Sequence, residues 1–110
     1  MKLGLSLVPL IIFIAAALLE VGGDAVVRHG LRGQKWAWIA LGCLMLGLYG
    51  VVVNTVKWDF SKLLGVYVAV FAVISVLVGR FWFQEAVSTS TWLGLAIIVV
   101  GGLLIQFGAR

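Results

Sequence analysis

Long apolar stretches alternate with short charged segments along the whole chain. A helix needs roughly 20 mainly apolar residues to cross the hydrocarbon core of a bilayer, which is about 30 Å thick. The apolar stretches cover residues 3–27, 36–56, 63–79 and 88–109. The third is the shortest, but Lys62 and Arg80 at its ends can extend their charged groups to the interface and complete the span. The pattern predicts an all-α integral membrane protein, with a single domain of four transmembrane helices.

The composition supports a membrane environment and excludes several other classes of protein. Of the 110 residues, 64% are hydrophobic and only 11% are charged, whereas a soluble domain usually carries about 25% charged residues. The lone Cys43 cannot close a disulfide within the chain and matches no metal-ligand spacing. We therefore expect no metal and no cofactor. The net charge of +4 lies next to the predicted helix ends, which is typical of contact with lipid headgroups rather than nucleic acid.

The beginning of the chain allows two interpretations. Lys2, an apolar run and three consecutive alanines at 15–17 fit the pattern of a cleaved signal peptide. The hydrophobic stretch continues past these alanines to Val27, however, which favours a retained first helix. We expect a multi-pass protein of the plasma membrane, which in a bacterium is the inner membrane.

The basic residues do not indicate an orientation in the membrane. Short connections make neighbouring helices antiparallel, so both chain ends and the second connection share one side. Four basic residues lie on that side (Lys2, Lys57, Lys62, Arg110) and four on the other (Arg28, Arg32, Lys35, Arg80). The positive-inside rule therefore gives no bias. Either a partner subunit or one dominant hairpin fixes the orientation, or the chain inserts both ways and forms an antiparallel homodimer. We favour the dual-topology dimer, because an inverted pair resembles the inverted repeats of larger transporters.

Two acidic residues lie inside the first apolar stretch. An ionised carboxylate at mid-bilayer costs about 2.5–3.5 kcal/mol on insertion scales. Glu20, Asp24 and Arg28 follow at intervals of four and lie on one helix face. Asp24 can simply pair with Arg28 near the helix end, or it can belong to a functional site. Glu20 lies deeper and has no cation three or four residues away on its helix, so we interpret it as a group that exchanges protons for a cation.

Other small and polar residues are weaker candidates. Gly22 and Gly23 follow Glu20 closely and allow the near approach of either a second helix or a substrate. Tyr67, Phe71 and Ser75 recur every four residues in the third stretch and form one helix face. That face either lines a cavity or packs against another helix.

The fourth stretch carries three glycines that suggest helix packing. Gly94 and Gly101 are two turns apart on nearly one face, and Gly102 follows. Such grooves support close contact, which here is either a dimer interface or packing within the chain. Two polar residues are expected at helix ends: Asn54 satisfies backbone groups after the second helix, and Ser88 caps the start of the fourth.

Several of these features occur together in one known family. They are an embedded glutamate motif, a basic residue eight positions later, a pair of glycines seven apart and a turn before the last helix. In this sequence they are Ala16-x-x-x-Glu20-Val21, Arg28, Gly94 with Gly101, and Gln84-Glu85. On these residues the chain resembles the small multidrug resistance family of the drug/metabolite transporter superfamily, over nearly its whole length.

The resemblance implies a site as well as a fold. It implies that Glu20, one from each subunit of an antiparallel dimer, forms a shared proton and cation site. It also implies a binding role for Tyr67, which falls where the family has a tryptophan of the binding chamber. Three departures indicate a divergent branch. Leu64 replaces a family tyrosine, Asp24 is an added acid, and residues 57–62 are charged where the family has a short turn with proline.

These features favour a small membrane transporter that exports a small cationic or polar compound in exchange for protons, by alternating access. Its expected partners are that compound, protons, the bilayer and a second copy of the chain or a paralogue. A subunit of a lipid-linked substrate flippase remains an alternative, with Asp24 and Arg28 as a polar track for a headgroup. A membrane scaffold, in which Glu20 is paired structurally, remains another. An ion channel would need a string of polar residues, and the sequence offers little beyond Asn54. We do not expect an enzyme, because the sequence offers no nucleophile–base pair.

Overall fold

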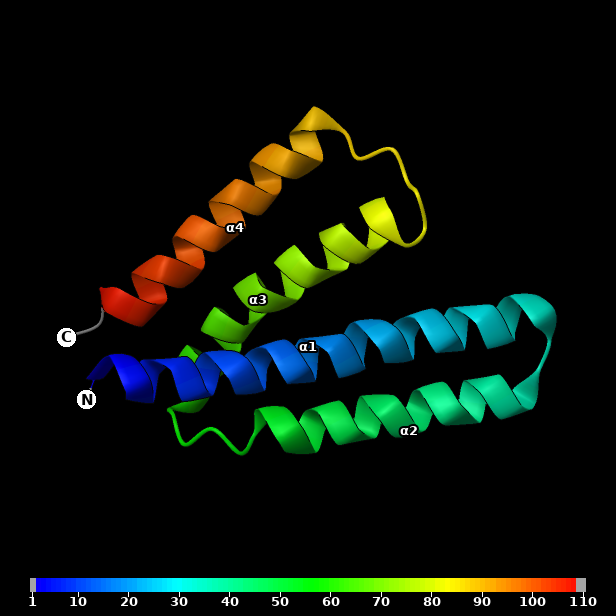
Figure 1. The fold of residues 1–110 in the computed structure, drawn as a ribbon, viewed down its shortest axis with the longest axis horizontal. Coiled ribbons are helices and arrows are strands. Elements are labelled where there is room, and N and C mark those ends of the chain that lie inside the picture. Colours follow the sequence, from blue (N-terminus) through cyan, green and yellow to red (C-terminus); the bar gives the residue numbers. More distant parts are fainter. Residues whose placement is uncertain (1, 109–110) are drawn as a thin grey trace. The chain divides into compact units, whose positions relative to one another are not determined.

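The chain folds into four α-helices, arranged as two hairpins. The computed structural model describes residues 2–108, and their side chains from residue 7 onward. The helices are α1 (Lys2–Gly33), α2 (Trp36–Val53), α3 (Phe60–Phe81) and α4 (Thr89–Phe107) (Figure 1). Residues 2–108 contain no strand. The chain divides into two compact units, Met1–Val56 and Lys57–Arg110, and each unit holds one hairpin.

All four helices meet the requirements for crossing a membrane. The qualifying segments are Leu7–Gly33, Trp36–Val53, Phe60–Phe81 and Thr89–Phe107. Large apolar side chains are exposed along them, and Val51, Ile97 and Leu104 are 67%, 72% and 66% exposed. So much exposed apolar surface is unfavourable in water but suits a hydrocarbon environment. The predicted all-α class with four membrane-spanning helices is confirmed.

The first helix is longer than predicted. The expected end was residue 27, with a basic loop from Arg28 to Lys35, but α1 continues through Gly33. Arginine and leucine both favour helix formation. The arginine charges do not prevent the helix from continuing, because these residues lie beyond the hydrocarbon core. The helix ends where Gln34 takes a left-handed conformation with φ 56°, and the Lys35 amide donates to the Gly30 carbonyl at 2.8 Å. Only Gln34 and Lys35 separate α1 from α2.

The second helix is shorter than predicted. It ends at Val53 rather than residue 56. The Asn54 side-chain amide donates to the Gly50 carbonyl at 2.7 Å, and the Thr55 hydroxyl donates to the Val52 carbonyl, also at 2.7 Å. The predicted role of Asn54 in satisfying backbone groups is thus confirmed. The same two carbonyls also accept backbone bonds, from the Asn54 amide at 3.4 Å and from the Thr55 amide at 3.1 Å.

The third helix covers 22 residues, from Phe60 to Phe81, rather than residues 63–79. At about 1.5 Å per residue it is roughly 33 Å long, so it spans a bilayer without help from flanking residues. The charged residues that were predicted to bound it lie inside it instead. Near its start, the Lys62 ammonium lies 4.3 Å from the centre of the Trp58 ring, which is favourable for both groups.

The fourth helix begins at Thr89, one residue after the predicted start. Ser88 is its N-cap as predicted, because its hydroxyl accepts a bond from the Thr91 amide at 3.2 Å. The predicted end at Ala109 and the predicted interfacial Arg110 lie outside the described residues.

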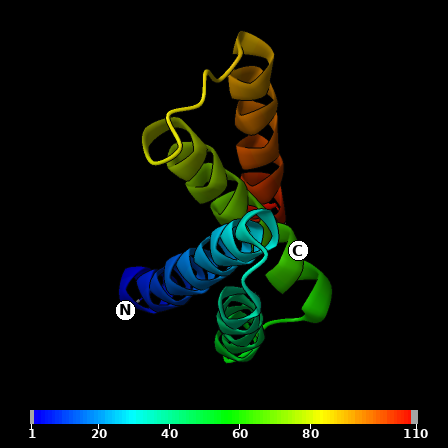
Figure 2. The ribbon, with the colours of Figure 1, turned by 90° about the vertical axis from the view of Figure 1, so that its right-hand side faces the viewer.

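In the first unit, α1 and α2 pack along an antiparallel seam (Figure 1), which Figure 2 views from the end with the short turn. A Cβ atom added at Gly30 would lie 2.7 Å from Ile39, and one at Gly23 would lie 3.0 Å from Leu46. A Cβ at Gly42 would lie 2.8 Å from both the Gly23 carbonyl and the Val27 amide. In each facing pair (Gly30 with Ile39, Gly23 with Leu46, Val27 with Gly42) the two residue numbers add up to 69, which defines the register of the hairpin. The packing is tight because one member of each of these pairs is glycine.

In the second unit, α3 and α4 make contact mainly near one end. A Cβ atom added at Gly65 would lie 2.6 Å from the Ile105 side chain, and one at Gly102 would lie 2.6 Å from the Ala69 Cβ. Toward the connecting segment the two helices diverge (Figure 1). That segment runs from residue 82 to 88 and includes Gln84 with φ 56°.

Candidate functional site

Glu20 lies well inside the first membrane-spanning helix. In α1 (Lys2–Gly33), eighteen residues precede it and thirteen follow it, which places it roughly 27 Å from one end of the helix and 20 Å from the other at 1.5 Å per residue. Its side chain is half-buried. Because α1 extends past the predicted end, Glu20 lies farther from the carboxyl end of its helix than the sequence indicated. A carboxyl group at this depth is unfavourable unless a proton or another group compensates its charge.

The partner residue that α2 brings to Glu20 is Tyr49. The two are close enough to interact electrostatically, and they follow the same register as Gly23 with Leu46 and Val27 with Gly42. Tyr49 is half-buried as well. Continuing the register by one step pairs Ala16 with Val53, which are 0% and 1% exposed. Glu20 and Tyr49 thus form a polar pair in a helix contact that is otherwise apolar and glycine-rich.

Tyr49 was not among the predicted site residues. The signal that identifies it is the length of the turn between the first two helices. A two-residue turn fixes the antiparallel register and hence the residue opposite Glu20. Because the basic segment 28–35 was predicted as a loop, the register could not be derived from the sequence.

The other candidates on α1 have different environments. Asp24 and Arg28 are both exposed, one and two turns beyond Glu20. Gly23 is buried, and it contacts Leu46 and the backbone of Gly42. This contact accounts for Gly23 as a helix-packing residue, the first of the two interpretations that the sequence left open.

The predicted face on α3 is present in the second unit. Tyr67 is 3% exposed, and the centre of its ring lies 6.3 Å from that of Phe71. The Ser75 hydroxyl donates to the Ala72 carbonyl at 2.9 Å, and Ser75 also lines a pocket between α3 and the segment that leads into α4. One end of this face is therefore buried, whereas the other borders open space.

The three glycines of α4 do not share one environment. A Cβ atom at Gly102 would meet Ala69 of α3, so Gly102 packs within the chain. Around Gly94 and Gly101 a Cβ atom would meet nothing within 4 Å. Both glycines therefore face space that the described residues leave open. Elsewhere, among the described residues, no three His, Cys, Asp or Glu side chains are grouped to hold a metal ion.

Comparison with known proteins places the chain among membrane proteins. Residues 6–110 match the family described as "Uncharacterised BCR, YnfA/UPF0060 family". A UPF0060 membrane protein of Rhodococcus erythropolis is 44% identical over 71 residues, covering 62% of this chain and 65% of that relative. A UPF0060 membrane protein of Synechocystis sp. is 31% identical over 102 residues, covering 92% and 94%.

A third relative extends the match over almost the full length of both proteins. The UPF0060 membrane protein YfjF of Bacillus subtilis is 31% identical over 108 residues, which cover 96% of this chain and 99% of that relative. No solved structure matches the chain. The resemblance to small multidrug resistance transporters stays a prediction, whereas the predicted multi-pass membrane protein is confirmed. The chain belongs to the YnfA/UPF0060 family of membrane proteins.

Proposed function

We propose that this protein is a proton-coupled exporter of a small cationic or polar compound, with Glu20 and Tyr49 at its binding site. The observation that carries the proposal is the position of Glu20. A carboxyl group well inside a membrane-spanning helix, opposed by a tyrosine from the neighbouring helix, is costly to maintain for stability alone.

The chemistry of this pair suits the exchange of a proton for a cation. A carboxyl group in a medium of low dielectric is favourable when it is protonated or when a cation compensates its charge. It therefore holds one or the other, and alternating access to the two sides couples their movement. The Tyr49 hydroxyl can donate a hydrogen bond to the carboxylate, which stabilises it during the interval between release of one ligand and binding of the other.

Assembly as an antiparallel homodimer completes the proposed transporter. Four helices are few for a solute pathway, and the balanced basic residues allow both orientations. The open space at Gly94 and Gly101 would allow the close approach of a partner helix to α4. The resemblance to small multidrug resistance transporters supports the same arrangement, in a bacterial inner membrane. A dimer with a paralogue has the same requirements.

The decisive experiment measures proton-coupled flux in proteoliposomes. Guanidinium and tetramethylammonium are suitable probes because they stay charged near neutral pH and do not cross lipid as neutral bases. We expect a gradient of a transported probe to change the lumenal pH, reported by pyranine. Glu20→Gln should abolish this change, and Tyr49→Phe should slow it about tenfold, because it removes one hydrogen bond to a charged group.

Asp24→Asn is the matched control, since it removes an exposed carboxylate one turn away on the same helix. It should retain coupled flux. Proton-coupled flux that persists in Glu20→Gln would overturn the proposal. A Glu20→Gln variant that merely lowers stability, with no flux in the unmodified protein for any probe, would favour the membrane scaffold instead.

Topology mapping tests the antiparallel dimer separately. In a Cys43→Ser background, single cysteines at Lys35 and Lys57 mark opposite ends of α2. If the chain inserts both ways, a membrane-impermeant maleimide should label about half of each variant on intact cells. Labelling of only one of the two positions would exclude the antiparallel homodimer.

A further inference from the structure

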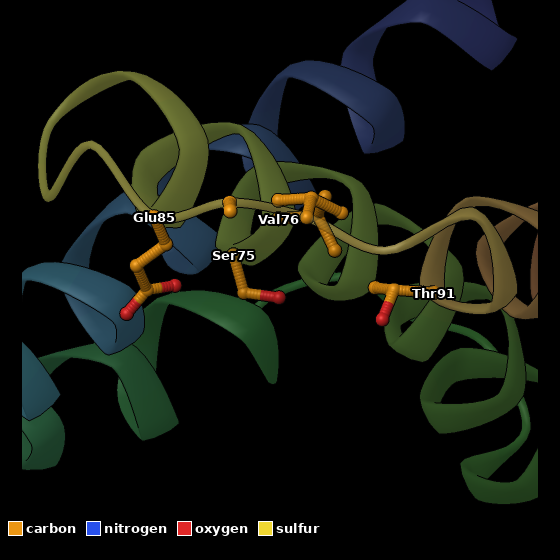
Figure 3. A pocket seen from close by; sticks show the side chains of 6 residues that line it. Ser75, Val76, Glu85 and Thr91 are labelled. Atoms are coloured by element: carbon orange, nitrogen blue, oxygen red, sulfur yellow. The ribbon is translucent and has the colours of Figure 1, made fainter.

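The second unit contains a pocket that is separate from the Glu20 pair. Its volume is about 210 Å³, and it is lined by Ser75, Val76, Glu85, Ala86, Val87 and Thr91. Small-molecule pockets for drug-sized ligands usually measure about 300–1,000 Å³, so this one suits a smaller molecule. In Figure 3, Ser75 lies between Glu85 and Thr91 along the pocket.

The polar groups in the pocket are hydrogen-bond acceptors. None of the six lining residues is basic, and among the described residues no ion pair is formed by Glu85. The nearby Arg80 instead has its guanidinium 5.3 Å from the centre of the Phe81 ring. The Ser75 hydrogen is directed to the Ala72 carbonyl at 2.9 Å, so its oxygen remains able to accept. The Thr91 hydroxyl is bonded to Ser88 at 2.9 Å and retains acceptor capacity as well.

The position of the Glu85 carboxylate also favours a cation. One of its oxygens lies only 2.6 Å from where a Cβ atom of Gly79 would be. Gly79 is in the last turn of α3, where the helix dipole places partial negative charge. Glu85 is exposed, so water solvates its carboxylate when no ligand is bound. A cation in the pocket would interact favourably with both the carboxylate and this helix end. The side chains of Val76, Ala86 and Val87 add apolar walls next to these acceptors.

We propose that this pocket binds a small primary alkylammonium group, with Glu85 as its counter-ion and Ser75 and Thr91 as further acceptors. An ammonium has three N–H donors and no acceptor, which complements one carboxylate and two hydroxyl oxygens. The short alkyl part lies against the apolar walls. The pocket borders the segment between two membrane-spanning helices, and exposed aromatic residues of that region, Phe81 and Trp82, mark the lipid interface.

Such an ammonium group has two possible sources at a membrane interface. It can belong to a soluble amine, or it can be the headgroup of phosphatidylethanolamine. The pocket does not require Glu20, so this proposal stands independently of the proposed transport.

Binding can be measured with ethylammonium as the probe, by saturation-transfer NMR on the full chain in nanodiscs of phosphatidylcholine and phosphatidylglycerol. We expect Glu85→Gln to weaken binding about tenfold, because it removes a charged hydrogen-bond acceptor. Gly79→Ala keeps every charge but displaces the carboxylate, whose flexible end can move without disturbing the helix. It should weaken binding as well, while circular dichroism remains unchanged.

A matched control tests whether the effect is local. Asp59→Asn removes one negative charge from the same unit, just before α3. It should leave ethylammonium binding unchanged. Unaltered binding in Glu85→Gln, or an equal loss in Asp59→Asn, would overturn the proposal.

Repeating the titration in nanodiscs that contain phosphatidylethanolamine distinguishes the two sources. Weaker apparent binding of ethylammonium there would identify the lipid headgroup as the occupant, since it competes for the site. Equal binding in both lipid mixtures would identify a soluble amine. Either result supports the ammonium pocket, provided that Glu85→Gln removes the binding.

Discussion

The two hairpins are held together by different kinds of contact. Between α1 and α2 the backbones themselves meet, because a Cβ atom at Gly42 would lie 2.8 Å from the Gly23 carbonyl. Between α3 and α4 the contacts made by the corresponding glycines are to side chains, those of Ile105 and Ala69. The Ile105 side chain can change its rotamer, whereas the Ala69 Cβ and a helix backbone can yield only if a whole helix moves. The spacing of the first hairpin is therefore fixed at its backbone contact, and the second hairpin can adjust at Gly65.

This difference matches the polar groups that each hairpin carries. The rigid seam between α1 and α2 fixes Glu20 at one depth in the membrane and opposite one partner, Tyr49. The second hairpin closes at Gly65 and Gly102 but leaves a pocket beside Glu85 at its other end. A group that must hold a proton at a defined depth benefits from a rigid frame, whereas a pocket for a small ligand needs space.

The largest expected effect is that of Gly42→Ala in the first seam. The added methyl group meets the backbone of Gly23 and both the backbone and side chain of Val27, so the helices must separate. We expect the free energy of unfolding to fall by about 3 kcal/mol. It can be measured by titration with sodium dodecyl sulfate in mixed micelles, followed by far-UV circular dichroism.

Gly47→Ala is the matched control for this substitution. Gly47 lies on the same helix, but a Cβ atom there meets nothing within 4 Å. Since alanine favours helix over glycine, stability should stay the same or rise slightly. If Gly42→Ala proved as stable as Gly47→Ala, the α1–α2 seam would not be the rigid element inferred here.

A smaller effect is expected for Gly102→Ala in the second hairpin. The new methyl group would lie 2.6 Å from the Ala69 Cβ, and α4 can shift because α3 and α4 diverge beyond this point. A loss of about 1–2 kcal/mol is expected, from the same titration. Gly101→Ala, one position earlier and facing open space within the chain, should leave the packing of α4 on α3 unchanged. Equal effects at Gly42 and Gly102 would remove the distinction between the hairpins.

The sequence was sufficient to predict the fold class, because four long apolar stretches have few alternatives. It also predicted the roles of Asn54 and Ser88 at helix ends, which depend on local hydrogen bonds alone. Helix ends near basic residues were predicted less well. Hydropathy marks where a helix leaves the hydrocarbon, not where its hydrogen bonds stop, and α1 continues six residues past that boundary.

The residue opposite Glu20 required three-dimensional information. Tyr49 can be identified only once the turn at Gln34 and Lys35 has fixed the register between α1 and α2. Spacing alone also could not distinguish the glycines of α4, because either Gly101 or Gly102 could lie on a contact surface. Only the position of Ala69 on α3 assigns Gly102 to packing within the chain. The expectation of a single four-helix domain stays a prediction.

The smallest expected effect concerns the way each hairpin starts its second helix. The two-residue turn before α2 provides no side-chain cap at Lys35, whereas α4 is capped by the Ser88 hydroxyl after a longer connection. Ser88→Ala should therefore lower the free energy of unfolding by about 1 kcal/mol, and Lys35→Ala should leave it nearly unchanged. Both are measurable by the same titration. A short turn defines the start of a helix by its backbone alone, but a seven-residue connection allows several starting points, and the cap selects one. If Ser88→Ala had no effect, that selection would have to come from the packing of α4 on α3, and the second hairpin would be as firmly determined as the first.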